Sequence, residues 1–360
     1  MISKRMRTGY ALILAALLAL PCLPAVRIQA ADGIDPDASG SITVSVTIGE
    51  GQEIQDEDYV EDFREMQIPV DVYRVASVDV TGQKYTAEKP FESMDLSGIG
   101  SETTASEWQS MAEEAAKKEN LDQAIHWRGN VQAGTVRFDD LKPGLYLVAP
   151  EETYNRDYTV QYAFTPYLTA LPSSDYALTG AGSDEWNYDT TIGLKPEAVP
   201  QYGKLNIVKT LRSYNETLGQ TTFAFLVEGR ETPGTDGPVV YSDVASITYG
   251  GAGTGAVVLD KIPAGLYVTV KEIYSGASYQ IVGEDTDRVL IWSDAAVEAA
   301  GNGGTVTDAV GNTVTADGAG VAFENEYDGG NRGGYGVTNH FDSDGNGGWN
   351  WENPTVPAEE

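Results

Sequence analysis

The sequence has very few of the residues that build metal and nucleophile sites, with one cysteine and two histidines among 360 residues. A zinc site of His and Cys ligands needs three or four such side chains, and a cysteine nucleophile needs a histidine base beside it. The composition therefore disfavours much hydrolytic and redox enzymology, while carboxylate chemistry stays open. We predict no cofactor and no bound metal.

Positive charge is also scarce. The chain has 23 Lys and Arg against 54 Asp and Glu, a formal charge of −31. Nucleic-acid binders need a basic face to displace counterions, and binders of anionic membranes need clustered Lys and Arg. We therefore expect no nucleic-acid partner. A content of 41% hydrophobic residues predicts packed cores rather than disorder, and the length fits two or three domains.

Residues 1–30 have the pattern of a secretory signal peptide. Basic residues precede an apolar run from Ala11 to Leu20, and small residues lead to a cleavage point after Ala30. The run is too short to cross a bilayer comfortably, so we expect no membrane insertion after cleavage. Residues 31–40 then form an N-terminal linker.

Cleavage removes Cys22, the sole cysteine. A lipoprotein would instead modify Cys22, but Pro21 stands where a small residue is wanted. We therefore expect a secreted protein that has no disulfide and is stiffened in another way.

Residues 41–195 predict a first β-rich domain. Apolar and polar residues alternate in SITVSVTI from Ser41 and in IPVDVYRVASV from Ile68, both rich in β-branched side chains. One helix interrupts them near 105–118, where Thr104 and Glu107 fit a capping box.

The rest of the chain predicts a linker, a second β domain and a tail. Residues 196–200 read as a short stiff linker because prolines bracket them. Short strands between turns then predict an antiparallel sandwich over 201–327. Residues 328–360 are rich in Gly, Asn and Asp and predict a flexible tail. A phrase built on Gly-Leu-Tyr occurs at Gly144 and Gly265, which suggests an internal duplication.

Three predicted strands of the second block each end an apolar row on a polar residue, namely Lys209, Glu272 and Asn325. An isolated ammonium or carboxylate is costly to bury, so a lysine and a glutamate aimed at one core must pair, neutralise or react. The polar ends meet if the three strands are neighbours. A buried ion pair and three solvent-facing residues are the alternatives.

These residues resemble the reactive set of the collagen-adhesin B-type (Cna-B) domains of Gram-positive surface proteins. Lys209 ends KLNIVKT, Glu272 ends GLYVTVKE and Asn325 lies in FENEY. The resemblance implies two tandem Ig-like β-sandwich domains and an intramolecular Lys209–Asn325 isopeptide bond, with Glu272 as the catalytic acid. An apolar pocket favours the uncharged forms of both titratable groups. Val268 departs from the family, which usually has an aromatic there.

The first block resembles the N-terminal domain of SpaA-type backbone pilins. In those proteins a WxxxVxVYPK segment supplies the lysine to which a sortase joins the next subunit. Trp186 and Lys195 have that spacing, with Thr190 and Ile192 at the apolar positions and Gly193-Leu194 in place of Tyr-Pro. The resemblance implies that Lys195 is a sortase acceptor, although an ordinary surface lysine remains the alternative.

The implied protein is a cell-surface or cell-wall structural subunit with no enzymatic activity beyond its own crosslinking. Its implied partners are other pilin subunits and a sortase. We find no LPXTG-like pentapeptide after the second block. We therefore expect that partners carry the subunit through Lys195, that it is retained non-covalently, or that this chain is a shortened version of an anchored one. The first block has Thr47 and no lysine in its opening strand, so we predict no isopeptide bond there.

Two other functions stay open. An adhesin or tip-like subunit could bind a host or cell-wall ligand through insertions at 151–162 or 228–241. A secreted glycosidase would use paired carboxylates, but no recognisable framework places two at catalytic separation.

Two local signals are weak. Asp342, Asp344 and Asn346 resemble a calcium loop, but the twelfth position is Asn353 and no helical pattern flanks it, which favours a flexible acidic tail. His126 is expected at the surface, with no evident partner.

Overall fold

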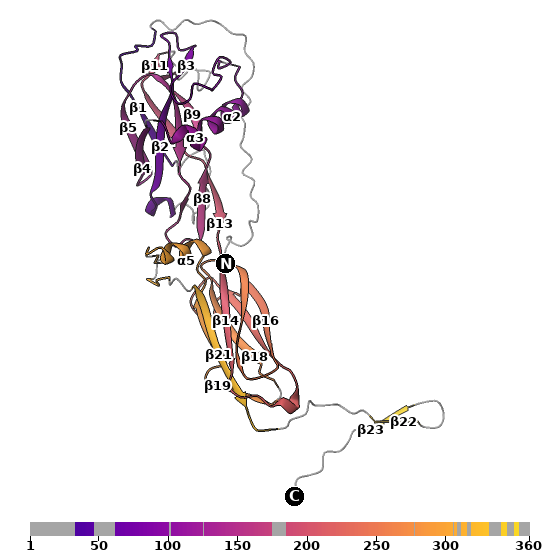
Figure 1. Ribbon diagram of the computed structural model, residues 1–360. Coiled ribbons are helices and arrows are strands. Elements are labelled where there is room, and N and C mark those ends of the chain that lie inside the picture. Colours follow the sequence, from indigo (N-terminus) through magenta and orange to yellow (C-terminus); the bar gives the residue numbers. More distant parts are fainter. Residues whose placement is uncertain are drawn as a thin grey trace. The chain divides into compact units, whose positions relative to one another are not determined.

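The computed structural model describes residues 33–46, 62–100, 102–124, 126–174, 185–276, 278–304, 306–307, 311–314, 318–330, 340–343 and 349–352. The predicted signal peptide and Thr47 lie outside these residues. The chain divides into two compact units. The first runs to Gly203 and includes Pro263–Gly265 and Trp292–Gly318, and the second comprises Lys204–Ile262, Leu266–Ile291 and the chain from Ala319. Strands dominate both units, which confirms the mainly β prediction (Figure 1).

The second unit is a sandwich of two four-stranded sheets, ordered β17-β14-β21-β19 and β16-β15-β18-β20. Its strands are β14 (Tyr202–Leu211), β15 (Thr221–Arg230), β16 (Tyr241–Tyr249), β17 (Gly253–Pro263), β18 (Tyr267–Tyr274), β19 (Tyr279–Val282), β20 (Thr286–Leu290) and β21 (Ala319–Tyr327). Side chains from both sheets form one core, which includes Ile207 of β14, Phe223 and Phe225 of β15, and Val270 of β18.

Strand β14 shows why this unit folds as a sandwich. Its inward positions are Leu205, Ile207, Lys209 and Leu211, each at most 1% exposed, and they alternate with half-buried or exposed residues. Strand β21 pairs with β14 in parallel register, with Lys209 opposite Phe323 and Leu211 opposite Asn325. Figure 1 shows the two strands side by side.

The first unit contains two larger sheets, ordered β12-β1-β5 and β3-β2-β6-β9 with β4 also paired to β2, and the smaller sheets β13-β8-β7 and β10-β11. Its strands are β1 (Gly40–Ser45), β2 (Ile68–Val78), β3 (Tyr85–Ala87), β4 (His126–Val131), β5 (Thr135–Leu141), β6 (Gly144–Pro150), β7 (Thr153–Tyr154), β8 (Val160–Phe164), β9 (Tyr167–Leu171), β10 (Ser173–Ser174), β11 (Trp186–Asn187), β12 (Asp189–Gly193) and β13 (Pro196–Pro200).

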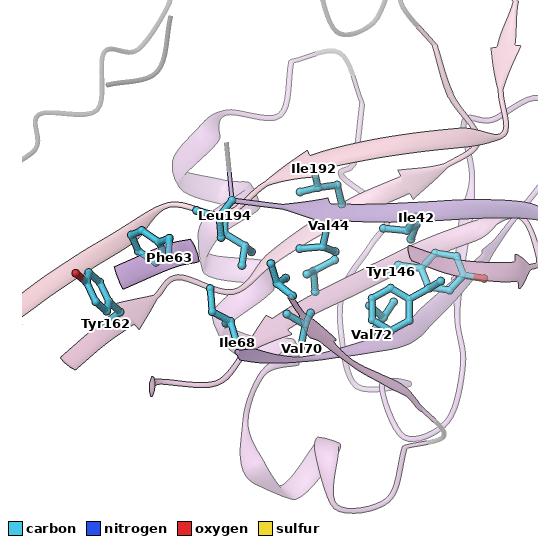
Figure 2. Close-up of a cluster of buried hydrophobic side chains, with 14 of the residues drawn as sticks. Ile42, Val44, Phe63, Ile68, Val70, Val72, Tyr146, Tyr162, Ile192 and Leu194 are labelled. Carbon is cyan, nitrogen blue, oxygen red and sulfur yellow. The ribbon is translucent and has the colours of Figure 1, made fainter. Parts of the chain in front are cut away.

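The core of the first unit is apolar where its two larger sheets face each other. Figure 2 shows Val44 of β1 and Ile192 of β12 opposite Val70 of β2, with Tyr146 of β6 nearby. Strands β1 and β12 are parallel, as β14 and β21 are in the second unit. The two units therefore share a parallel pair between an early and a late strand.

Helices are short. Helix α2 (Ala105–Ala115) begins at the predicted capping box, where the Thr104 hydroxyl accepts from the Glu107 amide and the Glu107 carboxylate accepts from the Thr104 amide. Ala112 and Ala115 are the buried residues of α2, and they belong to the same hydrophobic cluster as Leu145 and Leu147 of β6. Helix α3 spans Lys118–Leu121. In the part of the chain that the structure describes, no helix is long and apolar enough to span a membrane.

Three segments differ from the sequence prediction. Pro196–Pro200 is strand β13 rather than a linker, and it pairs antiparallel with β8. The prolines are tolerated because β13 is an edge strand. Asp294–Gly301 forms helix α5, capped by Ser293, within the segment Trp292–Gly318 that belongs to the first unit. The tail contains a hairpin of β22 (His340–Ser343) and β23 (Trp349–Glu352).

Candidate functional site

Lys209, Glu272 and Asn325 meet in the core of the second unit. The Lys209 Nζ donates to Glu272 Oε2 at 2.7 Å and to Asn325 Oδ1. The Asn325 Nδ2 donates to Glu272 Oε1 at 2.7 Å. The two oxygens of one carboxyl group therefore contact the amine and the amide nitrogen, and the three side chains close a ring of hydrogen bonds.

The strands of the sandwich explain this meeting. Strands β14 and β21 are neighbours in one sheet, so Lys209 and Asn325 project from the same layer into the core. Glu272 comes from β18 in the facing sheet, where it lies opposite Phe225 of β15. The lysine and asparagine are thus held side by side, and the carboxyl group reaches both from across the core.

Burial gives this ring its chemical character. Lys209 and Asn325 are fully buried and Glu272 is 4% exposed, which excludes the alternative in which these residues face solvent. The Lys209 Nζ lies 4.7 Å from the ring centroid of Phe223 and 5.8 Å from that of Phe225. Desolvation by this burial lowers the pKa of Lys209, and the hydrogen bond to Glu272 only partly opposes that shift.

The site contains the parts of an amide-exchange reaction. A buried amine that is more easily deprotonated is a nucleophile. The Asn325 carboxamide is an acyl group with a nitrogen leaving group, and the Glu272 carboxyl group can carry a proton between the two nitrogens. Neither a metal nor a second chain is needed to complete this set.

The sequence did not single out the aromatic residues beneath the amine. Phe223 and Phe225 point into the core from the inward side of β15, and both are 0% exposed to solvent. The alternation in TFAFLVEG could have placed them inward, but not beside Lys209. Val268 also lies in the core at 0% exposure, whereas Tyr267 is half-buried. The aromatic surroundings of the amine thus come from β15 rather than from β18.

Lys195 is exposed, in the two-residue break between β12 and β13. Two positions of its predicted motif, Thr190 and Ile192, are buried at 6% and 8% exposure. Trp186 is half-buried in β11. The motif thus packs its early residues into the first unit and presents its lysine to solvent.

The first unit has apolar side chains at the corresponding parallel pair. Val44, Ile192 and Leu194 are all buried there, as Figure 2 shows. Glu151 is exposed and pairs with Arg128 at 2.7 Å. The described part of this core therefore holds packed hydrocarbon where the second unit has its polar ring.

His126 has a neighbour that the sequence did not reveal. It lies exposed on β4, and its Nε2 is 3.8 Å from Oδ1 of Asp71 on β2. Its ring lies 5.2 Å from that of Tyr73, and Arg128 also pairs with Asp71 at 3.2 Å. These contacts follow from the antiparallel register of β2 and β4, which only the folded sheet specifies.

The structure adds little support to the calcium-loop pattern or to the 151–162 insertion as binding sites. Asp342 lies in β22, and Asp344 and Asn346 are outside the described residues. Among the residues that are described, no three His, Cys, Asp or Glu side chains gather as a metal site requires. In the 151–162 segment, Tyr154 and Tyr158 stack with ring centroids 5.0 Å apart.

Comparison with known proteins finds similarity in solved structures alone. No family model and no curated protein matches the chain. Matching structures include the major pilin SpaD of Corynebacterium diphtheriae, which is 12% identical with a TM-score of 0.25 and covers 82% of this chain and 99% of its own. The minor pilin GBS52 of Streptococcus agalactiae is 12% identical with a TM-score of 0.23, over 80% of this chain and 96% of its own.

A bacterial adhesin of Mobiluncus mulieris also matches. It is described as containing intramolecular disulfide, isopeptide and ester bond cross-links, and it is 14% identical with a TM-score of 0.24, over 72% of this chain and 84% of its own. Gram-positive pilins are thus among the proteins to which this chain is similar. Similarity at this level does not assign a function.

Proposed function

We propose that this chain is a structural subunit of a Gram-positive pilus whose second unit is closed by an isopeptide bond between Lys209 and Asn325. The observation that carries the proposal is the position of Glu272, whose two carboxyl oxygens each lie 2.7 Å from a nitrogen of the reaction. A buried salt bridge needs only the lysine and the carboxylate. The asparagine carboxamide completes a reactive set.

The reaction follows from these contacts. The neutral Lys209 amine attacks Cγ of Asn325, so that the Nζ–Cγ bond forms and the Cγ–Nδ2 bond breaks. Glu272 accepts a proton from Nζ through Oε2 and delivers a proton to Nδ2 through Oε1, and ammonia leaves. Burial among apolar side chains keeps water away from the amine and so favours its uncharged form.

The bond would suit a chain that bears load. Strands β14 and β21 are a parallel pair, early and late in the second unit. A pull on the two ends of this unit shears their ladder, and a covalent bond between Lys209 and Asn325 would bypass that ladder. The bond would also replace the disulfides that the chain cannot form once Cys22 is removed.

Assembly into a fibre is the finer part of the proposal. Lys195 is exposed between two strands of the first unit and follows the spacing of a sortase acceptor segment. A sortase would join another subunit to its amine, in a protein that is secreted and held at the cell surface or cell wall. The partners are therefore a sortase and other pilin subunits.

Intact mass tests the proposal. The mature wild-type chain should weigh roughly 17 Da less than its sequence predicts, the mass of one ammonia. The Lys209→Ala variant should show its full mass, whereas Lys204→Ala, at an exposed lysine of the same strand, should keep the deficit. A digest should contain one peptide that joins the segments of Lys209 and Asn325. A wild-type chain of full mass would refute the bond.

A further inference from the structure

Tyr249 connects the facing sheet to the backbone of the reactive lysine. It ends β16, is 8% exposed, and its hydroxyl donates to the carbonyl oxygen of Lys209 in β14. This hydrogen bond crosses the sandwich and reaches the residue that carries the nucleophile. Because a strand carbonyl normally bonds within its own sheet, a side chain from the other sheet is an unusual partner.

Gly255 makes room for this contact. It lies on β17, the neighbour of β14, and it faces inward with Val257 and Leu259 while the residues between them are exposed. A Cβ atom on Gly255 would lie 2.9 Å from the Tyr249 Oη and 3.4 Å from its Cζ. A glycine inside a strand often marks such a close approach.

The ring of Tyr249 touches the surroundings of the amine as well. It meets the Phe223 ring edge-on, with centroids 5.7 Å apart and planes at 78°. The same Phe223 ring lies beneath the Lys209 Nζ at 4.7 Å. Tyr249 therefore holds Lys209 at two points, directly at its backbone and through Phe223 at its amine.

We propose that Tyr249 is a positioning residue for the condensation of Lys209 with Asn325, and that Gly255 leaves the space that the Tyr249 hydroxyl occupies. The inference rests on the proposed function and leaves the chemical step unchanged: Nζ–Cγ forms, Cγ–Nδ2 breaks and ammonia leaves. A lysine side chain has four rotatable bonds, so fixing the Lys209 backbone reduces the number of positions that its Nζ can take relative to Cγ of Asn325. A misplacement of about 1 Å can cost about a hundredfold in rate.

The test is the rate of ammonia loss in the full chain. Newly synthesised protein from a short cell-free pulse is quenched in acid at intervals, and the fraction with the lower mass is read by mass spectrometry. Tyr249→Phe keeps the ring and removes only the hydroxyl, so we expect a rate about tenfold lower. The matched control is Tyr279→Phe, because Tyr279 packs on the same Phe223 ring at 5.8 Å while its hydroxyl accepts from Asn215 instead.

A pH profile separates positioning from altered acidity. The amine keeps its burial in Tyr249→Phe, so the midpoint of the rate against pH should match that of the wild type while the plateau is lower. A shifted midpoint at an unchanged plateau would overturn the positioning role. So would a Tyr249→Phe rate equal to that of the wild type.

Gly255→Ala gives a second, independent arm. Its new methyl group displaces the Tyr249 hydroxyl, so this variant should also be slow. The double variant Tyr249→Phe/Gly255→Ala should be no slower than Tyr249→Phe alone, because no hydroxyl remains to be displaced. Effects that multiply would overturn the inference. A wild-type chain that keeps its full mass overturns the proposed reaction as well, whereas normal wild-type loss with an unaffected Tyr249→Phe overturns only the inference.

Discussion

Glu272 Oε1 lies 2.7 Å from the Asn325 Nδ2, although the two residues come from facing sheets of the sandwich. This places the carboxyl group on the leaving nitrogen, and its second oxygen lies on the Lys209 amine. A proton can thus pass from nucleophile to leaving group through one side chain, without solvent. A buried ion pair would need only the lysine and the carboxylate, whereas here the asparagine carboxamide contacts both of them.

Glu272→Gln should slow bond formation strongly while preserving side-chain shape. Glutamine can hydrogen-bond both partners but cannot carry the proton, and loss of general acid–base catalysis typically costs 10²- to 10⁴-fold, so we expect a rate lower by about that factor. Intact mass would show the full sequence mass in freshly prepared protein. Glu326→Gln is the control, because Glu326 lies next to Asn325 on β21 but pairs with Gln280 on the outer face. A crosslinked Glu272→Gln chain would remove Glu272 from the mechanism.

Lys209→Met should weaken the second unit alone. Methionine keeps the apolar stem in the core but cannot form the bond. Closing a loop of about 100 residues is worth about 4.7 kcal/mol in the chain-entropy account of crosslinks, so we expect a loss of about that size in the free energy of unfolding. Calorimetry should show a lower transition for the second unit and an unchanged one for the first. Lys204→Met, at an exposed position of β14, should leave both transitions in place.

Ile192→Ala should weaken the first unit instead. Ile192 is buried opposite Val44 in the parallel pair, where packing takes the place of the polar ring. Truncating a buried isoleucine costs about 2 to 5 kcal/mol. The denaturant midpoint of the first unit should fall, while the mass deficit of roughly 17 Da, equal to one ammonia, should remain. An equal loss of stability in both units would contradict their separate cores.

Lys195→Ala should prevent incorporation into a polymer. Its amine is exposed, and the substitution removes no buried contact. With a cognate sortase and donor subunit, the wild type should yield a branched peptide at Lys195 by mass spectrometry. Lys84→Ala, at another exposed lysine of the first unit, is the control. Ligation that persists in Lys195→Ala, or that is lost in Lys84→Ala instead, would assign the acceptor elsewhere.

The three residues of the hydrogen-bond ring could be found from the sequence because strand alternation is local. Lys209, Glu272 and Asn325 each continue a row of alternate apolar residues. Alternate residues of a strand point to the same face of the sheet, so each of the three is expected to point into the core. Their mutual contacts needed more information, since alternation does not say which strands are neighbours. The family resemblance supplied that expectation, and the register of β14 with β21 provides the geometry.

Other features depend on the tertiary structure. Phe223, Phe225 and Tyr249 look like ordinary core aromatics in the sequence, and their relation to Lys209 exists only across the sandwich. The prolines of Pro196–Pro200 predict a linker because proline is a loop signal. That this segment is a strand depends on its pairing with β8, which the sequence does not specify. Helix α5 is eight residues long and gives too short a periodic pattern to stand out.

The rate of crosslinking should rise with pH and level off below the ordinary lysine range. Burial lowers the pKa of Lys209 from its usual 10.5, so the neutral, nucleophilic amine already dominates at a pH where an exposed lysine is still charged. Acid-quenched samples of newly synthesised chain, measured at several pH values, give the profile. Phe223→Leu keeps an apolar neighbour but removes a ring face that lies 4.7 Å from the amine and stabilises its charged form, so its profile should shift to lower pH than that of the wild type. A wild-type rate that climbs up to pH 10.5 would show that the amine is not held neutral by its pocket, and the burial of Lys209 would then have no part in its reactivity.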